Sequence, residues 1–194
     1  MTNGLKKNRD LYEVELRAIQ QLIPSQEAKG VEIGVGSGKF AARLGIKIGV
    51  EPSEKMAIKA RKQGINVYRG IAEDLPFPGD RFDFVLMVTT ICFVDDVIKS
   101  FREAFRVLKP SGCIIVGFAD KESELGRQYA DKKRKKANFT NMPLFFSTQE
   151  VLKYLKEVGF EIVKIRQTLI PGELPGAILD GFGRGAFIVI KGVK

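Results

Sequence analysis

Three glycines alternate at one predicted turn between a strand and a helix, within residues 32–38, which read EIGVGSG. Glycines at such a turn adopt backbone dihedrals that are closed to other residues, and they let amide N–H groups approach a bound molecule near the start of the following helix. Nicotinamide- and flavin-binding folds space their glycines as GxGxxG, whereas Lys39 stands at the third glycine position here. The turn therefore predicts a ligand site, and its GxGxG spacing weakens the case for a dinucleotide.

An acidic residue follows the glycine turn at the end of the next predicted strand. Glu51 comes seventeen residues after Gly34 and is followed by Pro52 and Ser53. A carboxylate at this position can accept hydrogen bonds from both hydroxyls of a ribose, and charge-assisted bonds contribute roughly 1.5–3 kcal/mol each. An exposed acid at a strand end is the structural alternative for Glu51 taken alone. After a glycine turn at this spacing, ribose binding is favoured.

The absence of histidine excludes several kinds of chemistry. It removes the commonest general base, the commonest zinc ligand and every Ser-His or Cys-His nucleophile pair. The two cysteines, Cys92 and Cys113, lie in apolar stretches, where a free thiol behaves as a small hydrophobe, so we expect both to be reduced. Carboxylates form no convincing cluster beyond helix caps such as Asp95 and Asp96, and we expect no metal site.

The formal net charge of +9 allows two interpretations. Basic patches attract phosphates, which would suit a nucleic acid or an anionic surface. The basic residues are scattered, however, except at 132–136 (KKRKK), and a single charge run is more often a solvated helix face. No apolar run reaches the ~18 residues of a membrane span, and no N-terminal apolar segment indicates a signal peptide, so we expect no membrane contact and a cytoplasmic location.

Short β-rich runs alternate with helical stretches along most of the chain. This alternation predicts parallel strands with right-handed crossovers, an α/β doubly wound sheet with helices on both faces. The Gly- and Pro-rich residues 171–185 join the last two predicted strands, which indicates an antiparallel hairpin at one sheet edge. The predicted strands cover residues 31–35, 46–50, 65–69, 82–88, 113–118, 160–167 and 186–191, and the predicted helices cover residues 10–23, 40–44, 54–63, 97–108 and 151–158.

A length of 194 residues suits one domain, residues 1–194. Residues 1–28 would supply an N-terminal helix that precedes the first strand. Residues 120–146 are polar, highly charged and without a clean period, and they predict a small cap insertion after the fifth strand. Ser147 and Glu150 then have the spacing of a capping box, which marks the start of a helix.

Four motifs in order resemble class I S-adenosylmethionine-dependent methyltransferases, in the branch that includes the ubiquinone and menaquinone biosynthesis methyltransferases (methyltransferase type 11 domain). They are EIGVGSG at 32–38, VEPS at 50–53, GIAEDLPF at 70–77 and RVLKPSG at 106–112. The glycine turn alone is weak evidence, but four motifs in this order are specific and span most of the chain. The resemblance implies a Rossmann-like, seven-stranded, mostly parallel sheet whose last strand is antiparallel.

The resemblance also implies a site for S-adenosylmethionine, with S-adenosylhomocysteine as the product. Gly34, Gly36 and Gly38 would lie against the methionine and ribose portions of the cofactor. Glu32 would help to hold its amino group, and Glu51 would bind the ribose hydroxyls. The implied cofactor-binding residues are Glu32, Gly34, Gly36, Ser37, Gly38, Glu51, Pro52, Ser53, Ala72, Glu73, Val88 and Thr89.

One departure from the family concerns the adenine. Ala72 and Glu73 would lie beside the adenine ring. Many relatives have Asp after the glycine of the third motif, where it accepts from the adenine amino group, whereas this chain has Ile71. We expect that contact to move to Glu73 or Asp74, or to be lost.

The resemblance favours methyl transfer to a small-molecule acceptor. Holding the nucleophile, the methyl carbon and the sulfur in line can supply roughly 7–11 kcal/mol without a dedicated acid or base, which suits a chain without histidine. The Asn-Pro-Pro-Tyr or Asp-Pro-Pro-Tyr signature that base-modifying nucleic-acid methyltransferases commonly carry after the fourth strand is absent. The alternatives are an RNA methyltransferase or RNA-binding protein that uses residues 132–136, and a non-catalytic S-adenosylmethionine-binding protein.

Two segments could cover the acceptor side of the site. For the N-terminal helix, amphipathic packing against the sheet is favoured, and closure over the cofactor, with Tyr12 and Glu15 on one side, is the alternative. The predicted cap could line a mostly apolar acceptor site, although ordinary core packing is the better interpretation for any single aromatic residue. The aromatic residues of the cap are Tyr129, Phe139, Phe145 and Phe146.

Overall fold

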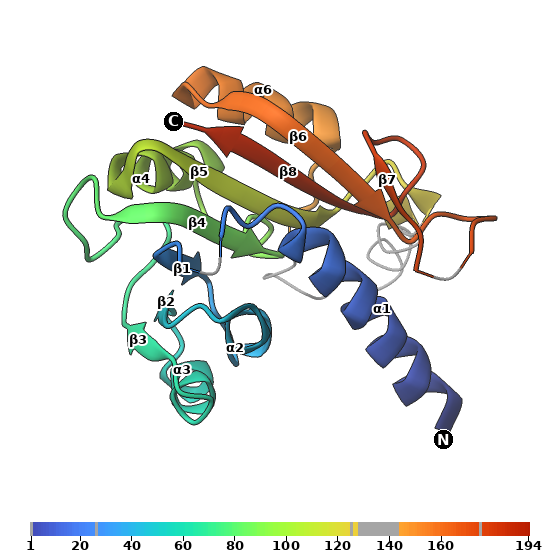
Figure 1. The fold of residues 1–194 in the computed structure, drawn as a ribbon, viewed down its shortest axis with the longest axis horizontal. Coiled ribbons are helices and arrows are strands. Elements are labelled where there is room, and N and C mark those ends of the chain that lie inside the picture. Colours follow the sequence, from blue (N-terminus) through green and yellow to red (C-terminus); the bar gives the residue numbers. More distant parts are fainter. Residues whose placement is uncertain (1, 26, 125, 128–143, 175) are drawn as a thin grey trace.

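The computed structural model describes residues 2–25, 27–124, 126–127, 144–174 and 176–194. An eight-stranded sheet in the order β3-β2-β1-β4-β5-β8-β6-β7 carries helices on both faces (Figure 1). The strands are β1 (Gly30–Ile33), β2 (Ile48–Val50), β3 (Asn66–Tyr68), β4 (Phe82–Val88), β5 (Leu108–Ala119), β6 (Glu161–Thr168), β7 (Ile178–Asp180) and β8 (Phe187–Val193). The helices are α1 (Thr2–Gln20), α2 (Lys39–Leu44), α3 (Glu54–Arg61), α4 (Val97–Val107) and α6 (Thr148–Val158).

Two hydrophobic clusters hold the helices to the sheet, one on each face. Phe101 of α4 and Leu155 of α6 belong to the cluster on one face. Ile19 of α1, Ala41 of α2 and Ala60 of α3 belong to the cluster on the other face. Because each of the five helices named above buries one apolar side against the strands, the sheet is covered on both faces, as the alternating sequence pattern predicts.

The strand directions confirm the predicted α/β doubly wound class. Strands β1 to β5 run parallel, and β8 pairs antiparallel with both β5 and β6. The sheet has eight strands rather than seven, because Ile178–Asp180 forms β7 against β6 within the predicted connection 171–185. Three residues are too few to show the alternation by which strands are recognised in a sequence.

The N-terminal helix is longer than predicted at its start and shorter at its end. Helix α1 begins at Thr2 rather than at Asp10, which lies inside the helix, and it ends at Gln20 rather than at residue 23. Residues 5–7 (LKK) have good helix propensity, which favours a helix that already includes the residues before position 10, where its start was predicted.

Side-chain caps fix the starts of two later helices. The Ser147 Oγ accepts a hydrogen bond from the Glu150 amide, and the Glu150 carboxylate accepts one from the Ser147 amide, so the predicted capping box is present at α6. At α4 the Asp96 side chain accepts from the Lys99 amide at 2.9 Å.

The carboxyl ends of the parallel strands meet at one edge of the sheet, and this brings the sequence motifs together. The glycine turn follows β1, Glu51 follows β2 and Thr89 follows β4. Ligands bind at this edge in open α/β sheets. Of the predicted cap, residues 128–143 lie outside the described part of the chain, and with them Tyr129, Phe139 and the basic run 132–136. In the part that the structure describes, no helix is long and apolar enough to cross a membrane.

Candidate cofactor and methyl-acceptor site

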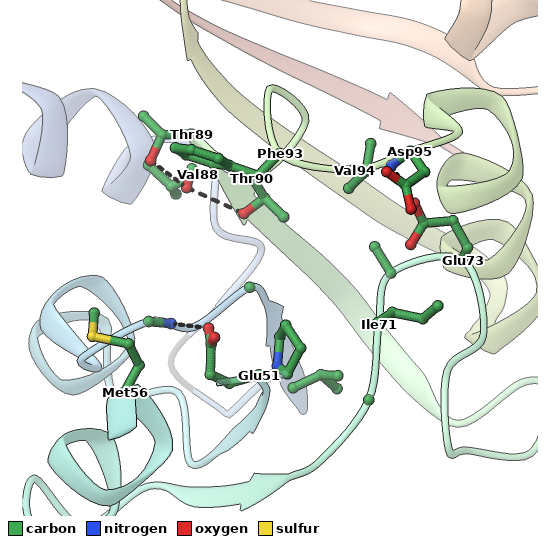
Figure 2. A pocket seen from close by; sticks show the side chains of 16 residues that line it. Glu51, Met56, Ile71, Glu73, Val88, Thr89, Thr90, Phe93, Val94 and Asp95 are labelled. Carbon is green, nitrogen blue, oxygen red and sulfur yellow. Dashed lines mark hydrogen bonds between the residues drawn. The ribbon is translucent and has the colours of Figure 1, made fainter. Parts of the chain in front are cut away.

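A cavity of about 540 Å³ opens at the carboxyl edge of the sheet (Figure 2). Its wall is formed by the glycine turn, the end of β2, the segment after β3 and the loop between β4 and α4. Most of the wall is backbone or apolar side chain. Its acidic side chains are Glu51, Glu73 and Asp95. The lining residues are Gly34, Gly36, Val50, Glu51, Pro52, Met56, Gly70, Ile71, Ala72, Glu73, Val88, Thr89, Thr90, Phe93, Val94 and Asp95.

The glycines of the turn have different surroundings. Gly36 has a φ of 54°, and a Cβ there would meet nothing closer than the Met56 Cε at 3.7 Å, because it would project into the cavity. Gly38 has a φ of 83°, and a Cβ there would lie 2.6 Å from the Ile65 Cδ1 and 3.1 Å from the Ala60 Cα. Gly36 therefore leaves room for a ligand, whereas Gly38 allows close packing against α3.

Glu51 connects the end of β2 to the glycine turn. Its Oε2 accepts a hydrogen bond from the Gly36 amide at 2.9 Å, and its Oε1 accepts one from the Ser53 amide at 3.0 Å. Figure 2 shows the carboxylate of Glu51 facing the cavity beside the glycine turn. Each carboxylate oxygen has two lone pairs, so both can still accept a hydrogen bond from a hydroxyl of a ligand.

Glu73 connects the segment after β3 to the start of α4. Its Oε1 accepts hydrogen bonds from the Asp95 amide at 2.7 Å and from the Asp96 amide at 3.2 Å, and the residue is 8% exposed. Glu73 lines the cavity, whereas Asp74 is exposed and does not. Of the two acids considered for the adenine contact, the geometry therefore favours Glu73.

The backbone at the end of β4 is held in a strained conformation. Thr89 has a φ of 53°, which is rare for a β-branched residue and costs roughly 1–2 kcal/mol. Its amide donates to the Gly117 carbonyl at 2.7 Å, its Oγ1 donates to the Val88 carbonyl at 2.7 Å, and its carbonyl accepts from the Cys92 Sγ at 2.9 Å. These contacts fix the loop that forms the β4 side of the cavity.

Glu32 is a buried carboxylate at the end of β1, close to the glycine turn. The residue is 2% exposed, and its Oε2 has no hydrogen-bond partner among the described residues. Burial raises the pKa of Glu32 to about 8, while a hydrogen bond from the Ala41 amide opposes that shift. An unpartnered buried carboxylate is costly unless a cation or a donor approaches it.

Eight of the twelve predicted cofactor-binding residues line the cavity, and four do not. The four are Glu32, which is buried; Ser37, whose carbonyl accepts from the Gln63 side chain; Gly38, which packs on α3; and Ser53, whose amide donates to Glu51. The lining residues outside the predicted set are Val50, Met56, Gly70, Ile71, Thr90, Phe93, Val94 and Asp95. Met56 carries no motif, and only its place five residues after Glu51 points to the site. Phe93 follows the fourth predicted strand, whose carboxyl end the sequence places at this edge of the sheet.

A doubly wound sheet with a glycine turn after β1 and an acid after β2 defines a Rossmann-like protein that binds a nucleoside-containing cofactor. Residues 31–116 match a methyltransferase domain (Methyltransf_11). The solved structure of an S-adenosylmethionine-dependent methyltransferase from Thermotoga maritima, a possible histamine N-methyltransferase, is 50% identical; the match covers 94% of this chain and 89% of that chain, with a TM-score of 0.86.

Two sequence relatives extend the comparison. An uncharacterized protein from Methanocaldococcus jannaschii is 41% identical over 97% of this chain and 92% of its own length. A ubiquinone/menaquinone biosynthesis C-methyltransferase from Rickettsia bellii is 33% identical over 48% of this chain and 45% of its own length. The chain belongs to the family of S-adenosylmethionine-dependent methyltransferases, and S-adenosylmethionine is its cofactor.

The described residues fit this cofactor in three respects. The cavity is large enough for a nucleoside and keeps the space above Gly36 open. The Glu51 carboxylate lies in its wall, where a ribose needs an acceptor. The orphaned Oε2 of Glu32 lies near the glycine turn, where an ammonium group would satisfy it.

Proposed function

We propose that this protein transfers the methyl group of S-adenosylmethionine to a small-molecule acceptor, with residues 1–194 forming one methyltransferase domain. The observation that carries the proposal is the cavity that joins the glycine turn, Glu51 and the loop after β4 in one wall. These three features lie at the edge where the parallel strands end. S-adenosylmethionine held by the glycine turn and Glu51 would present its methyl group toward the loop after β4.

The cofactor contacts follow from the positions of four groups. Glu51 would accept hydrogen bonds from the ribose hydroxyls, and the open face of Gly36 would admit the sugar. Glu73 would accept from the adenine amino group with Oε2, since the amides of Asp95 and Asp96 both donate to Oε1. Glu32 would offer a negative charge to the amino group of the methionine portion, which a carboxylate in a buried position binds strongly.

Positioning and exclusion of water account for the catalysis. S-adenosylmethionine supplies a methyl group on a positively charged sulfur, which is already activated for in-line displacement. The protein has to hold an acceptor on the far side of that carbon, which can supply roughly 7–11 kcal/mol. The strained and well-bonded Thr89 gives the β4 side of the cavity a fixed shape for this purpose.

A small acceptor is supported over RNA by two observations. The segment after β4 reads TTICF and carries no Asn-Pro-Pro-Tyr or Asp-Pro-Pro-Tyr signature. The relatives from Thermotoga maritima and Rickettsia bellii bear names that refer to histamine and to quinones, both of which are small molecules.

A two-stage experiment tests the proposal. First, thermal shifts with S-adenosylhomocysteine, NADH and FAD should show stabilisation by S-adenosylhomocysteine, since a ligand of the native state stabilises by RT ln(1 + [L]/Kd). Second, label from methyl-labelled S-adenosylmethionine should enter a small-molecule extract and not total RNA. Preferential labelling of RNA would support the RNA alternative, and cofactor binding without any transfer would support a non-catalytic protein.

A further inference from the structure

We propose that the acceptor is a positively charged amine and that the carboxylate of Glu15, on the inner face of α1, binds it. This inference rests on the proposed function, because it concerns the acceptor side of the same site. The starting observation is that Glu15 lies on the face of α1 that packs on the protein, and that no described side chain pairs with it.

Glu15 belongs to the apolar stripe by which α1 packs on the sheet. Ala18 and Ile19 lie on that stripe, and Leu22 follows two residues after the helix ends; all three are buried in the cluster that includes Val88 at the end of β4. Positions i, i+3, i+4 and i+7 share one face of a helix. Glu15 is the charged member of an otherwise apolar face, so its side chain is directed toward the body of the protein.

The direction of α1 places Glu15 at the edge of the sheet where the cavity opens. Gln20, at the end of α1, shares a pocket with Gly30 and Ile48, which are the first residues of β1 and β2. Glu15 precedes Gln20 by five residues, about 7.5 Å of helix at 1.5 Å per residue, and the short strands β1 and β2 have comparable lengths. Helix α1 therefore reaches the carboxyl ends of the strands near Glu15, and in Figure 1 it continues beyond that edge past the end of β4.

Tyr12, one turn earlier on α1, ties this part of the helix to the cofactor site. Its hydroxyl donates to the carbonyl of Lys39, the residue after the glycine turn, at 2.8 Å. Burial chiefly raises the pKa of Tyr12 and Arg43 opposes that shift, while the charges of Glu13, Glu32 and Glu15 add to it in that order. Glu15 thus lies within electrostatic reach of the end of β1.

Among the side chains that the structure describes, which begin at residue 10, none forms a hydrogen bond or an ion pair with Glu15. Two arginines of this region, Arg17 on α1 and Arg43 on α2, are engaged elsewhere. Arg17 donates to the Gly176 carbonyl at 3.3 Å, and Arg43 pairs with Glu13 at 2.9 Å. Burial raises the pKa of Glu15 to about 7, which is the expected response of a carboxylate that loses water and gains no partner. A cationic ligand would restore the favourable environment of the charged form.

The two unpartnered carboxylates would serve different ammonium groups. Glu32 is fixed on β1 directly before the glycine turn, where the methionine portion of the cofactor is proposed to lie. Glu15 stands on a separate element, α1, which is not part of the cavity wall and runs past this edge of the sheet. The amino group of the cofactor therefore goes to Glu32, and Glu15 remains for an amine of the acceptor.

Calorimetry with a matched pair of probes tests the inference. The probes are 2-phenylethylamine and 2-phenylethanol, titrated into protein saturated with S-adenosylhomocysteine; their aromatic ring suits Phe93, which is 71% exposed and lines the cavity. A charge-assisted hydrogen bond predicts that the amine binds roughly ten- to hundredfold more tightly than the alcohol. Glu15→Gln should abolish this preference and leave the affinity for S-adenosylhomocysteine within twofold of the original. Glu13→Gln, on the exposed side of the same helix, is the matched control and should keep the preference.

A spectroscopic measurement on the unaltered chain covers the case in which Glu15→Gln does not fold. With glutamate labelled at the carboxyl carbon, the amine should shift the Glu15 resonance toward the ionised form at pH 7, and the alcohol should not. Equal binding of amine and alcohol, an unshifted resonance, or loss of S-adenosylhomocysteine binding in Glu15→Gln would each overturn the inference. Failure of the unaltered protein to bind S-adenosylhomocysteine would instead overturn the proposed function.

Discussion

The Gly36 amide donates a hydrogen bond to the Glu51 Oε2 at 2.9 Å, across fifteen residues of sequence. The contact joins the turn after β1 to the end of β2, so the acid that faces the cavity also fixes the turn beside it. A change at either residue should therefore affect both the shape of the turn and the binding of the cofactor.

Glu51→Ala should weaken the binding of S-adenosylhomocysteine by about 1.5–3 kcal/mol, or ten- to hundredfold, because the ribose hydroxyls lose a charged acceptor. Titration calorimetry measures the change directly. Glu54→Ala is the matched control, since Glu54 is an exposed acid three residues later that pairs with Arg61. Equal affinity in Glu51→Ala and the unaltered protein would place the ribose elsewhere.

Alanine at Gly36 and at Gly38 should produce opposite profiles. At Gly36 the added Cβ has space in the fold but enters the cavity, so we expect at least a tenfold loss of S-adenosylhomocysteine affinity with a stability cost of roughly 1–2 kcal/mol from the positive φ. At Gly38 the Cβ would lie 2.6 Å from the Ile65 Cδ1 and 3.1 Å from the Ala60 Cα. The free energy of unfolding should therefore fall by more in Gly38→Ala than in Gly36→Ala. Urea unfolding and calorimetry on both variants check the order, and a reversed order would contradict the different roles of the two glycines.

Glu73→Gln should change which purine the site prefers. The glutamine oxygen can still accept from the Asp95 amide, so the start of α4 is expected to survive, while the amide group would face the purine in place of a carboxylate oxygen. The unaltered protein should bind S-adenosylhomocysteine better than S-inosylhomocysteine, which has a carbonyl in place of the amino group. In Glu73→Gln this preference should fall about tenfold. An unchanged ratio of the two affinities would remove Glu73 from the adenine contact.

Glu32 should make the protein less stable as the pH rises. Its pKa is about 8 in the folded chain against an ordinary value of 4.5, so between these pH values the folded state binds more protons than the unfolded state. The free energy of unfolding contributed by this group is therefore greatest below pH 4.5 and is lost as the pH rises through about 8. Glu32→Gln should reduce the loss of stability between pH 5 and pH 8 by roughly 2–4 kcal/mol, since one pKa unit corresponds to about 1.4 kcal/mol. Urea unfolding at pH 5 and pH 8 measures this loss. An identical loss in Glu32→Gln and in the unaltered protein would contradict the raised pKa of Glu32.

The sequence by itself determined the class of fold and the family of the protein. Alternating strands and helices fix a doubly wound sheet, because periodicity and caps such as Ser147 are local properties of the chain. Glycine spacing and the acid at position 51 identify the cofactor edge, because parallel strands bring the residues that follow them to one side.

Only the tertiary structure decided what each of these residues contacts. It separated Gly36, which borders the cavity, from Gly38, which packs on α3, and it placed Glu73 rather than Asp74 in the cavity wall. It also placed β7 at the sheet edge and directed Glu15 inward without a described partner. These outcomes depend on which distant segments pack together, and a pattern that repeats every two or 3.6 residues carries no information about that packing.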